Sequence, residues 1–516
     1  MPEAVGFRSV LFRTPEDEVV FKESQPPACL SDLNLDQLIE SVTKDKEEYD
    51  LKGFFCRPLQ NSDAVMYRQE IVRDLQDEAI IVAVKAFAER MRTMRRHRAR
   101  GDQLTNQWQK RRWSFDAAKA YCEAVSCLSN DLTAASLKSS GLAELRRYLS
   151  AYMSSPHFIS LVEDTQHLDA DLSAVGYSIL INERTLRVQR YEGEDDWTSQ
   201  IDSLLQRFQD LDLEPAPTSY RFKFPEWPGM SQVEEKVLEF VARLWPDTFK
   251  ALEGYTLKHS NFIDSTIATF DREMQFYLSY LEYTSRFKDL PLSLPVVITV
   301  EKDIYARDAY DLPLATRLHP KRGTIVSNSF YLQNQERIIV ITGPNQGGKT
   351  TFARSFGQLH YLAALGLPVP AREARLFLFD KLFTHFDREE DLHDLRGSLE
   401  DALVRIRDII VQATTRSIII MNESFSSTTL EDAIFLSSKV LETIISLDLL
   451  CVCVTFIDEL AVLSRTIVSM TASVAPDDPE TRTYRITRRP PDGIAHALSI
   501  ATKHRLTFDA IVGRIK

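Results

Sequence analysis

A glycine-rich octapeptide limits the fold of this chain more than any other part of its sequence. Residues 343–350 read GPNQGGKT, which fits the pattern G-x-x-x-x-G-K-[ST]. An apolar β-branched run, residues 338–342, comes directly before it, and a segment with helical periodicity follows. Glycines at these positions let backbone N–H groups surround phosphate oxygens at the N-terminus of a helix. A chance glycine-rich turn is the alternative, but the strand–loop–helix context favours a P-loop.

The P-loop predicts a nucleotide site with ATP and Mg²⁺ as its ligands. Lys349 would reach the β- and γ-phosphates, and the Thr350 hydroxyl would bind Mg²⁺. The residues that we expect to surround the nucleotide are Gly343, Pro344, Asn345, Gln346, Gly347, Gly348, Lys349, Thr350 and Thr351.

A second apolar run, downstream of the P-loop, ends in two polar residues. Residues 417–421 read SIIIM and are followed by Asn422 and Glu423. At the C-terminal end of a strand, Glu423 could orient or deprotonate an attacking water. Asn422 could contribute to the metal site, although an amide brings no charge to oppose Mg²⁺. The alternative is that Glu423 caps the following helix; the P-loop context favours the catalytic role.

The periodicity of apolar residues predicts two kinds of structure along the chain. Before residue 295, most segments place apolar residues three and four apart, as helices do, and residues 177–191 indicate one β-hairpin. After it, short β-branched runs alternate with helical segments, which predicts a mostly parallel sheet with helices on both faces. We therefore expect a multidomain α and α/β protein: an N-terminal segment 1–29, a helical core and lever 30–295, and a P-loop ATPase domain 296–516.

Composition excludes several classes of protein. The chain has 62 basic and 74 acidic residues, a net charge of −12, which argues against nucleic-acid binding over its whole surface but not at one groove. Six cysteines without a C-x-x-C pair indicate no structural metal and a reducing, cytoplasmic location. The N-terminus lacks a signal-peptide pattern, and no apolar run approaches the ~20 residues of a membrane span, so we expect no membrane contact.

The P-loop and its surroundings resemble the MutS family of DNA mismatch-repair ATPases, whose P-loop reads T-G-P-N-x-x-G-K-S-T. Residues 342–351 read TGPNQGGKTT, and residues 310–314 and 325–328 are similar to the family's lead-in segments. Residues 380–384 resemble the segment before the family's signature loop, and Ser398 stands where that loop has its serine.

The resemblance is specific over about residues 300–515 and weaker over 30–290. It implies an ABC-like ATPase domain, a homodimer and composite nucleotide sites. The signature serine of one subunit completes the site of the other, so Ser398 would act in catalysis with Lys349 and Glu423. Helices leading from the ATPase would couple nucleotide state to the grip on DNA. An ordinary helix N-cap is the alternative for Ser398.

Some features of the sequence depart from the family. Only about 30 residues precede the helical core, so we expect no mismatch-recognition domain, and the Phe-x-Glu tripeptide at residues 21–23 is a coincidence. The sequence ends at Lys516, so we expect no nuclease-like Smr tail. Phe456 falls where the family has a histidine, and Asn422 replaces an aspartate, so we expect slow hydrolysis. These features indicate a short MutS-related branch.

A basic run, residues 90–113, is the candidate DNA contact. It holds nine basic residues and one acidic residue, and Trp108 and Trp113 lie among them. A solvated helix face with acidic neighbours explains such a run equally well. Residues 183–226, where the family has its DNA clamp, hold six basic and ten acidic residues, which is poor for gripping a duplex. The residues that we select for DNA contact are Arg92, Arg95, Arg96, Arg98, Arg111 and Arg112.

The sequence therefore predicts a DNA-binding ATPase of the MutS type. It would bind mismatched or otherwise unusual DNA and hydrolyse ATP in the composite sites of a dimer. One alternative is a nucleotide-gated scaffold whose helical arms hold another protein and never contact DNA. A second alternative, a P-loop kinase of a small molecule, predicts a lid and an acceptor pocket instead of a long lever.

Overall fold

The chain forms two compact units that interleave in sequence. The computed structural model describes residues 6–182, 185–193, 230–319, 323–386, 398–425, 428–475, 478–491 and 511. Unit 1 comprises Met1–Phe7, Glu78–Ser136 and Glu144–Asp271. Unit 2 comprises Arg8–Asp77, Leu137–Ala143 and Arg272–Lys516. The linear division into three segments that we predicted stays a prediction.

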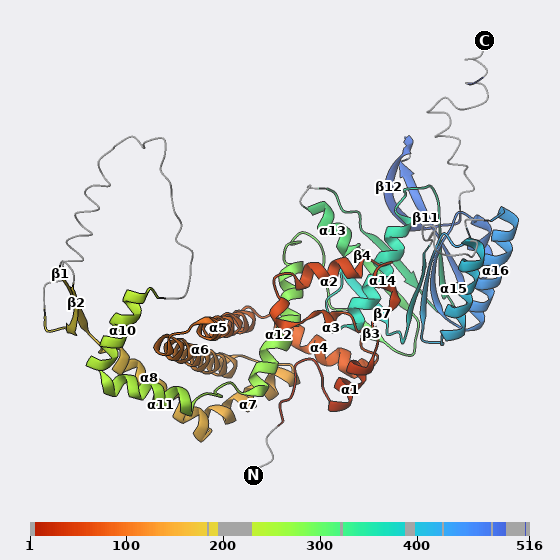
Figure 1. Ribbon diagram of the computed structural model, residues 1–516. Coiled ribbons are helices and arrows are strands. Elements are labelled where there is room, and N and C mark those ends of the chain that lie inside the picture. The colour runs from red at the N-terminus through yellow and green to blue at the C-terminus, as the bar shows by residue number, and fades with distance from the viewer. Residues whose placement is uncertain are drawn as a thin grey trace. The chain divides into compact units, whose positions relative to one another are not determined.

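Unit 1 consists mainly of helices, and two long ones run side by side in Figure 1. Its helices are α5 (Glu78–Gln103), α6 (Gln107–Ala134), α8 (Pro156–Ser173), α10 (Gln232–Leu244) and α11 (Pro246–Lys258). Two more helices contribute residues to both units: α7 (Ser140–Met153) and α12 (Ser265–Thr284). The strands β1 (Tyr177–Asn182) and β2 (Thr185–Arg190) pair antiparallel, so the predicted hairpin is confirmed.

The turn between α5 and α6 is fixed by a side-chain cap. The Asn106 carboxamide oxygen accepts hydrogen bonds from the backbone N–H groups of Trp108 (3.0 Å) and Gln109 (3.2 Å). These groups have no partner within a helix, which is why asparagine is favoured at this position. The cap places the basic run at the turn of a helical hairpin, because that run ends α5 and begins α6.

The first helices of unit 2 surround an aromatic cluster. They are α1 (Pro15–Glu23), η1 (Ala28–Leu30), α2 (Leu35–Thr43), η2 (Glu47–Tyr49), α3 (Lys52–Phe55) and α4 (Ser62–Asp74). The Phe21 ring is buried, 4.9 Å from the Phe12 ring, and the Arg68 guanidinium lies over both rings. Phe21 is therefore a core residue, in keeping with our interpretation of its tripeptide as a coincidence.

The rest of unit 2 contains two sheets and the helices that pack on them. Their strands are β3 (Val296–Ile298), β4 (Ile304–Ala309), β5 (Asn328–Leu332), β6 (Ile338–Thr342), β7 (Glu373–Phe377), β8 (Leu382–Phe386), β9 (Ile418–Asn422), β10 (Leu450–Val454), β11 (Ile467–Ala475) and β12 (Asp478–Arg488). The six-stranded sheet has the order β12-β11-β6-β10-β9-β8, and only the β11–β12 pair is antiparallel. The four-stranded sheet has the order β3-β7-β4-β5. The predicted mixed fold with a mostly parallel sheet is confirmed.

Helices cover both faces of the six-stranded sheet (Figure 1). They are α14 (Lys349–Ala364), α15 (Ser398–Gln412) and α16 (Leu430–Ser446), with the 3₁₀ helix η4 (Asp458–Val462) nearby. Successive side chains of a strand point to opposite faces. Ile420 therefore meets α14 at Gly357, where a Cβ would come within 2.8 Å of it, whereas Ile419 and Met421 join the core under α15 and α16.

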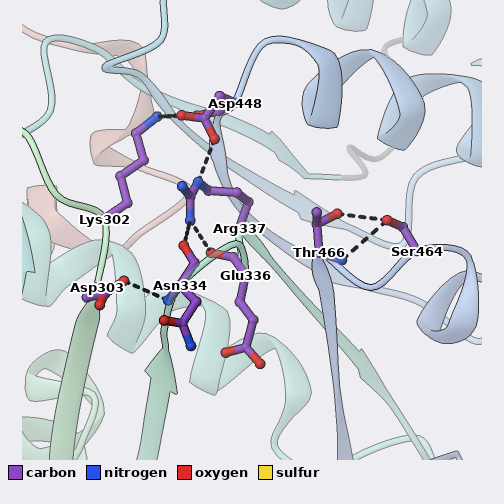
Figure 2. A network of polar contacts seen from close by, with 8 residues as sticks. All are labelled: Lys302, Asp303, Asn334, Glu336, Arg337, Asp448, Ser464 and Thr466. Carbon is purple, nitrogen blue, oxygen red and sulfur yellow. Dashed lines mark hydrogen bonds and ion pairs between the residues drawn. The ribbon is translucent and has the colours of Figure 1, made fainter.

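A network of charged side chains connects the residues that precede β6 and β10, at the amino ends of these strands (Figure 2). The Lys302 ammonium donates to the Asp448 carboxylate (2.8 Å), and the Arg337 guanidinium donates to its other oxygen (2.5 Å). Arg337 also donates to the backbone oxygens of Asn334 (2.7 Å) and Glu336 (2.8 Å). Burial alone would raise the pKa of Asp448, but the bonds from Lys302 and Arg337 outweigh it and lower that pKa.

The helical periodicity of the sequence runs across breaks between helices. The chain is interrupted between α4 and α5, and again between residue 258, where α11 ends, and residue 265, where α12 begins. Residues 311–321 contain the helix α13 (Leu312–Leu318). Residues 198–208, which also have helical periodicity in the sequence, lie outside the described residues. Among the described helices, none combines the length and the apolar character needed to cross a membrane.

Candidate functional site

The P-loop connects the buried strand β6 to the N-terminus of α14. All five residues of β6 are buried, and the loop then turns through left-handed conformations at Gly343 (φ 115°), Gln346 (φ 60°) and Gly348 (φ 89°). A Cβ at Gly343 would lie 3.0 Å from the backbone oxygen of Ala472. Glycine is therefore required at Gly343 both by its conformation and by the neighbouring strand β11.

Lys349 points back into the loop that precedes it. Its side chain is 4% exposed, and its ammonium donates to the backbone oxygens of Gly343 (2.9 Å) and Pro344 (3.1 Å). The same ammonium lies 4.5 Å from the centre of the Phe456 ring, a cation–π distance. Phe456, which stands where the MutS family has a histidine, thus holds an aromatic ring against the P-loop lysine.

The charges around Lys349 act in opposite directions. Burial lowers the pKa of its ammonium, the carboxylate of Glu423 raises it, and the cationic Arg482 lowers it further. Burial destabilises the charged form of the Lys349 side chain, because the ammonium loses contact with water. A bound anion stabilises the charged form again, and it does so more strongly for a buried ammonium than for an exposed one. A triphosphate would supply this negative charge.

The Thr350 hydroxyl and the Asn422 side chain meet directly. The hydroxyl donates to the Asn422 carboxamide oxygen over 2.9 Å, because α14 begins beside the C-terminal end of β9. A hydroxyl and an amide oxygen are hard ligands of the kind that Mg²⁺ accepts. The pair fits the predicted metal position, although neither group is charged. Among the described residues, no three His, Cys, Asp or Glu side chains form a metal-binding group.

The loop after Asn422 has an unusual backbone. Glu423 (φ 54°) and Phe425 (φ 64°) are both left-handed, a conformation that costs a non-glycine residue of order 1–3 kcal/mol. The Glu423 N–H donates to the backbone oxygen of Val454 (2.9 Å), and the Phe425 ring is buried. Strain of this kind persists only where surrounding contacts fix the backbone, and it gathers at functional sites.

One further contact fixes this loop. The Ser424 hydroxyl is hydrogen-bonded to Nδ1 of His385 over 2.9 Å, and His385 is 2% exposed on the neighbouring strand β8. Parallel pairing of β8 with β9 sets His385 opposite Met421, so the ring reaches the loop just beyond the strand end. The helix after this loop, α16, is capped by Thr429 and not by Glu423, so the capping alternative for Glu423 was wrong.

The second half of the P-loop and Glu423 line a cavity of about 490 Å³. Seven of the residues predicted for the site line it: Gln346, Gly347, Gly348, Lys349, Thr350, Thr351 and Glu423. Gly343, Pro344 and Asn345 belong to the same loop, and Asn422 joins the site through Thr350. Ser398 is the first residue of α15, and its side chain lies outside the described part of the structure.

The cavity has lining residues that our sequence reasoning missed. Leu318 comes from α13 and Tyr484 from β12, far apart in the chain. Asn328 holds Tyr484 in place: its amide donates to the Tyr484 backbone oxygen (3.1 Å), and its side-chain oxygen accepts from the Ile486 N–H (2.7 Å). Packing between distant parts of the chain brings these residues together, so no local signal predicts them.

The basic run of unit 1 is partly paired. Arg95 forms an ion pair with Asp271, Arg111 with Glu253, and Arg112 with Asp116 (3.0 Å). These three therefore agree with the alternative of a solvated face with acidic neighbours.

The other three arginines that we selected differ from these. Arg92 is half-buried, whereas Arg96 and Arg98 are exposed and make no ion pair within the described part of unit 1. The clamp that we expected near 183–226 lies largely outside the described residues.

Part of the cavity lining lies in a segment of the chain that matches a known domain. Residues 339–493 match the model of MutS domain V. The chain is 27% identical over 235 residues to the DNA mismatch repair protein MutS of Thermotoga maritima, which covers 44% of this chain and 27% of that protein. It is 28% identical over 213 residues to MutS of Shouchella clausii, covering 41% of this chain and 23% of that protein.

A shorter match reaches a higher identity. The chain is 36% identical over 124 residues to the DNA mismatch repair protein MutS of Orientia tsutsugamushi, which covers 24% of this chain and 14% of that protein. The chain thus spans about a quarter or less of the length of these curated relatives. All the matched features, from β6 through the P-loop to β12, lie in unit 2. Over its C-terminal part, this chain is similar to DNA mismatch repair proteins of the MutS family.

Proposed function

We propose that this protein is an ATPase that binds DNA and hydrolyses ATP in the composite sites of a homodimer. One observation carries the proposal: Lys349, Thr350 and Glu423 line a single cavity at the carboxyl ends of β6 and β9, and Asn422 is bonded to Thr350. The named function of the relatives, DNA mismatch repair, supports a DNA ligand. Mismatched or otherwise unusual DNA is the class that we propose.

The residues of the cavity would divide the chemistry between them. Backbone N–H groups of the P-loop and the Lys349 ammonium would bind the phosphates, and Glu423 would orient the attacking water and accept its proton. Thr350 and Asn422 would hold Mg²⁺, which neutralises phosphate charge when bound. The exposed Tyr484 ring, at the wall of the cavity, offers an aromatic face for the nucleotide base.

We expect hydrolysis to be slow. Asn422 brings no negative charge to the metal side, and the Phe456 ring can neither donate nor accept a hydrogen bond at the phosphates. The Lys349 ammonium already donates to the backbone oxygens of Gly343 and Pro344, which leaves one of its three N–H donors for a phosphate.

A second copy of the chain would complete the site. Phe456 is 51% exposed although its ring contacts the P-loop lysine, and Phe435 of α16 (61%) and Val462 of η4 (70%) are exposed nearby along the same unit. Large apolar side chains on α16 and η4, two elements in contact, are suited to a protein interface. Ser398 of the second copy would then contribute to catalysis.

Two measurements test this proposal. The first is phosphate release from ATP by the wild-type protein and by Glu423→Gln, with Glu40→Gln on the exposed face of α2 as the control. Loss of turnover in Glu423→Gln alone is expected, and equal turnover in all three would refute the site. The second is fluorescence anisotropy with homoduplex, mismatched and branched DNA at low salt, with ATP and with ADP. No binding to any of them would refute the DNA function.

The nucleotide-gated scaffold remains the second candidate. The ion pairs of Arg95, Arg111 and Arg112 favour it, because they remove half of the selected arginines from contact with phosphates. Its signature would be Glu423-dependent hydrolysis together with no DNA binding at low salt.

A further inference from the structure

A second cavity, of about 340 Å³, lies within unit 1 beside the turn of the α5–α6 hairpin. The end of α5 and the start of α6 form one wall, and the segment that joins α11 to α12 forms the other. Arg98, Lys110 and Arg111 supply its cations, and Asp102 is the one acidic residue that lines it. The cavity therefore has a surplus of positive charge, unlike the chain as a whole.

The three cations are not equivalent. The Arg111 guanidinium is bonded to Glu253 and lies 4.6 Å from the Trp108 ring, so it is held in place as part of the wall. Arg98 and Lys110 are exposed, and neither forms an ion pair or a hydrogen bond within the described residues of unit 1. These two side chains are available to an anion.

Neutral donors complete the cavity. The hydroxyls of Ser114 and Ser260 and the carboxamide of Asn261 line it, and none of them has a hydrogen-bond partner among the residues described. Hydroxyl, amide, guanidinium and ammonium groups together are the donors that contact phosphate oxygens in protein–DNA interfaces. The cavity thus offers two available cations and three neutral donors, and only one acidic residue lines it. This balance favours phosphate as the ligand, because phosphate is an anion that accepts hydrogen bonds.

We propose that this cavity binds a phosphate of a DNA backbone and is a DNA contact of unit 1. This inference rests on the proposed DNA-binding function and assigns it to a site. Arg98, Asp102, Lys110, Ser260 and Asn261 are all exposed, so the cavity opens to solvent and a continuous phosphate chain can lie across its mouth.

Beyond the cavity, further exposed arginines follow along the helix α5. Arg96 and Arg100 are exposed on α5, one turn apart, and the Arg100 guanidinium lies 5.4 Å from the Trp113 ring. A free phosphate ion would need only the cavity, whereas a polymer would also contact this row. The row therefore favours DNA over a small anion.

The experiment compares two double variants of the full-length chain. Arg98→Gln/Lys110→Gln removes the two available cations, and Arg147→Gln/Lys250→Gln removes two other exposed cations of unit 1 as the control. Binding of a labelled duplex is followed by fluorescence anisotropy between about 50 and 200 mM salt. All four side chains are exposed, so both proteins should fold, which circular dichroism checks.

We expect the cavity variant to lose about tenfold or more in affinity at low salt, and its slope of log K against log [salt] to fall by about 2. The control should keep the wild-type affinity and slope. Equal affinity and slope in the two variants, with wild-type DNA binding intact, would overturn the cavity assignment alone. Absence of wild-type binding at low salt would instead overturn the DNA function, and this assignment with it.

A third measurement tests whether the ligand of the cavity is a DNA phosphate or a free anion. Inorganic phosphate is titrated against the DNA complex and compared with chloride at equal ionic strength. Displacement by phosphate no stronger than by chloride supports a backbone contact. Tight binding of inorganic phosphate that depends on Arg98 and Lys110, combined with DNA binding that does not, would make the cavity a small-anion site and refute the proposal.

Discussion

The two cavities hold their cations in opposite ways. In unit 2, the Lys349 ammonium is buried, bonded to two backbone oxygens and covered by the Phe456 ring. In unit 1, Arg98 and Lys110 are exposed and have no partner among the described residues. A buried cation that is already bonded gives a selective site, because a ligand must match the geometry that those bonds fix. Exposed cations give a site that responds to charge and depends on salt.

The largest expected effect is the loss of ATP hydrolysis, without loss of DNA binding, when the P-loop lysine is replaced. Replacing Lys349 by Ala should lower ATP hydrolysis by about 100-fold or more, because one preorganised cation at the phosphates is lost. DNA binding without nucleotide should stay at the wild-type level. Lys44→Ala, which removes an exposed lysine directly after α2, is the control. Phosphate release and anisotropy measure the two activities, and an equal loss of both would contradict the contrast.

Salt should act on one cavity far more than on the other. Between about 50 and 200 mM salt, DNA affinity should fall about tenfold or more, because released counterions drive the binding. ATP affinity should change by less than about threefold, because a buried charge is screened little. Isothermal titration with ATP and anisotropy with DNA give the two slopes. Parallel slopes would show that the nucleotide site is as open as the cavity of unit 1.

The contact between His385 and Ser424 tests how far the site of unit 2 is preorganised. His385→Leu should lower kcat about tenfold with little change in KM, because the strained Glu423 backbone loses a support that nucleotide binding does not need. His385→Asn, which keeps a hydrogen-bonding atom near Nδ1, should restore most of the activity. Ser424→Ala should match His385→Leu, and the double variant should be no worse than either. Additive losses would mean that the two residues act independently.

A smaller effect concerns the support behind the nucleotide site. Asp448→Asn should destabilise β10 by about 1 kcal/mol, a modest value because the carboxylate is half exposed, although it leaves Lys302, with a side chain 7% exposed, less well paired. Hydrogen exchange of the Cys451 amide, which donates to the Arg337 oxygen, is the measurement. Unchanged protection of the Cys451 amide in the variant would mean that the network of Asp448, Lys302 and Arg337 does not stabilise β10.

The network should also show a pH dependence. The pKa of Asp448 is lowered in the folded protein by Lys302 and Arg337, so its contribution is present above the unfolded pKa and is lost as the pH falls below about 4. The Asp448→Asn variant should lack this part of the acid sensitivity. Arg98 and Lys110 in unit 1 make no such pair among the described residues, so their replacement should leave the acid profile unchanged.

The P-loop was predictable because its geometry is local. Eight consecutive residues contain the glycines, the lysine and the threonine, and the strand and helix that flank them follow from short periodic patterns. The parallel sheet followed from alternating segments for the same reason. Glu423 and Asn422 could be placed because a strand end fixes both residues.

The remaining features depend on contacts between distant parts of the chain. Tyr484 reaches the cavity of unit 2 only because β12 pairs with β11, and His385 reaches Ser424 only because β8 pairs with β9. A count of charges found the basic run, but it could not show that Asp271 and Glu253 neutralise two of its arginines. Periodicity also overlooked the interleaving of the two units, since helices of both have the same pattern.

The left-handed backbone of Glu423 and Phe425 has a consequence for motion. Each residue must cross a steric barrier to leave that conformation, so the loop cannot drift through intermediate shapes. Its movement should instead be all-or-none, with the Ser424–His385 bond made in one arrangement and broken in the other. Events at the nucleotide would then reach the rest of unit 2 as a discrete step.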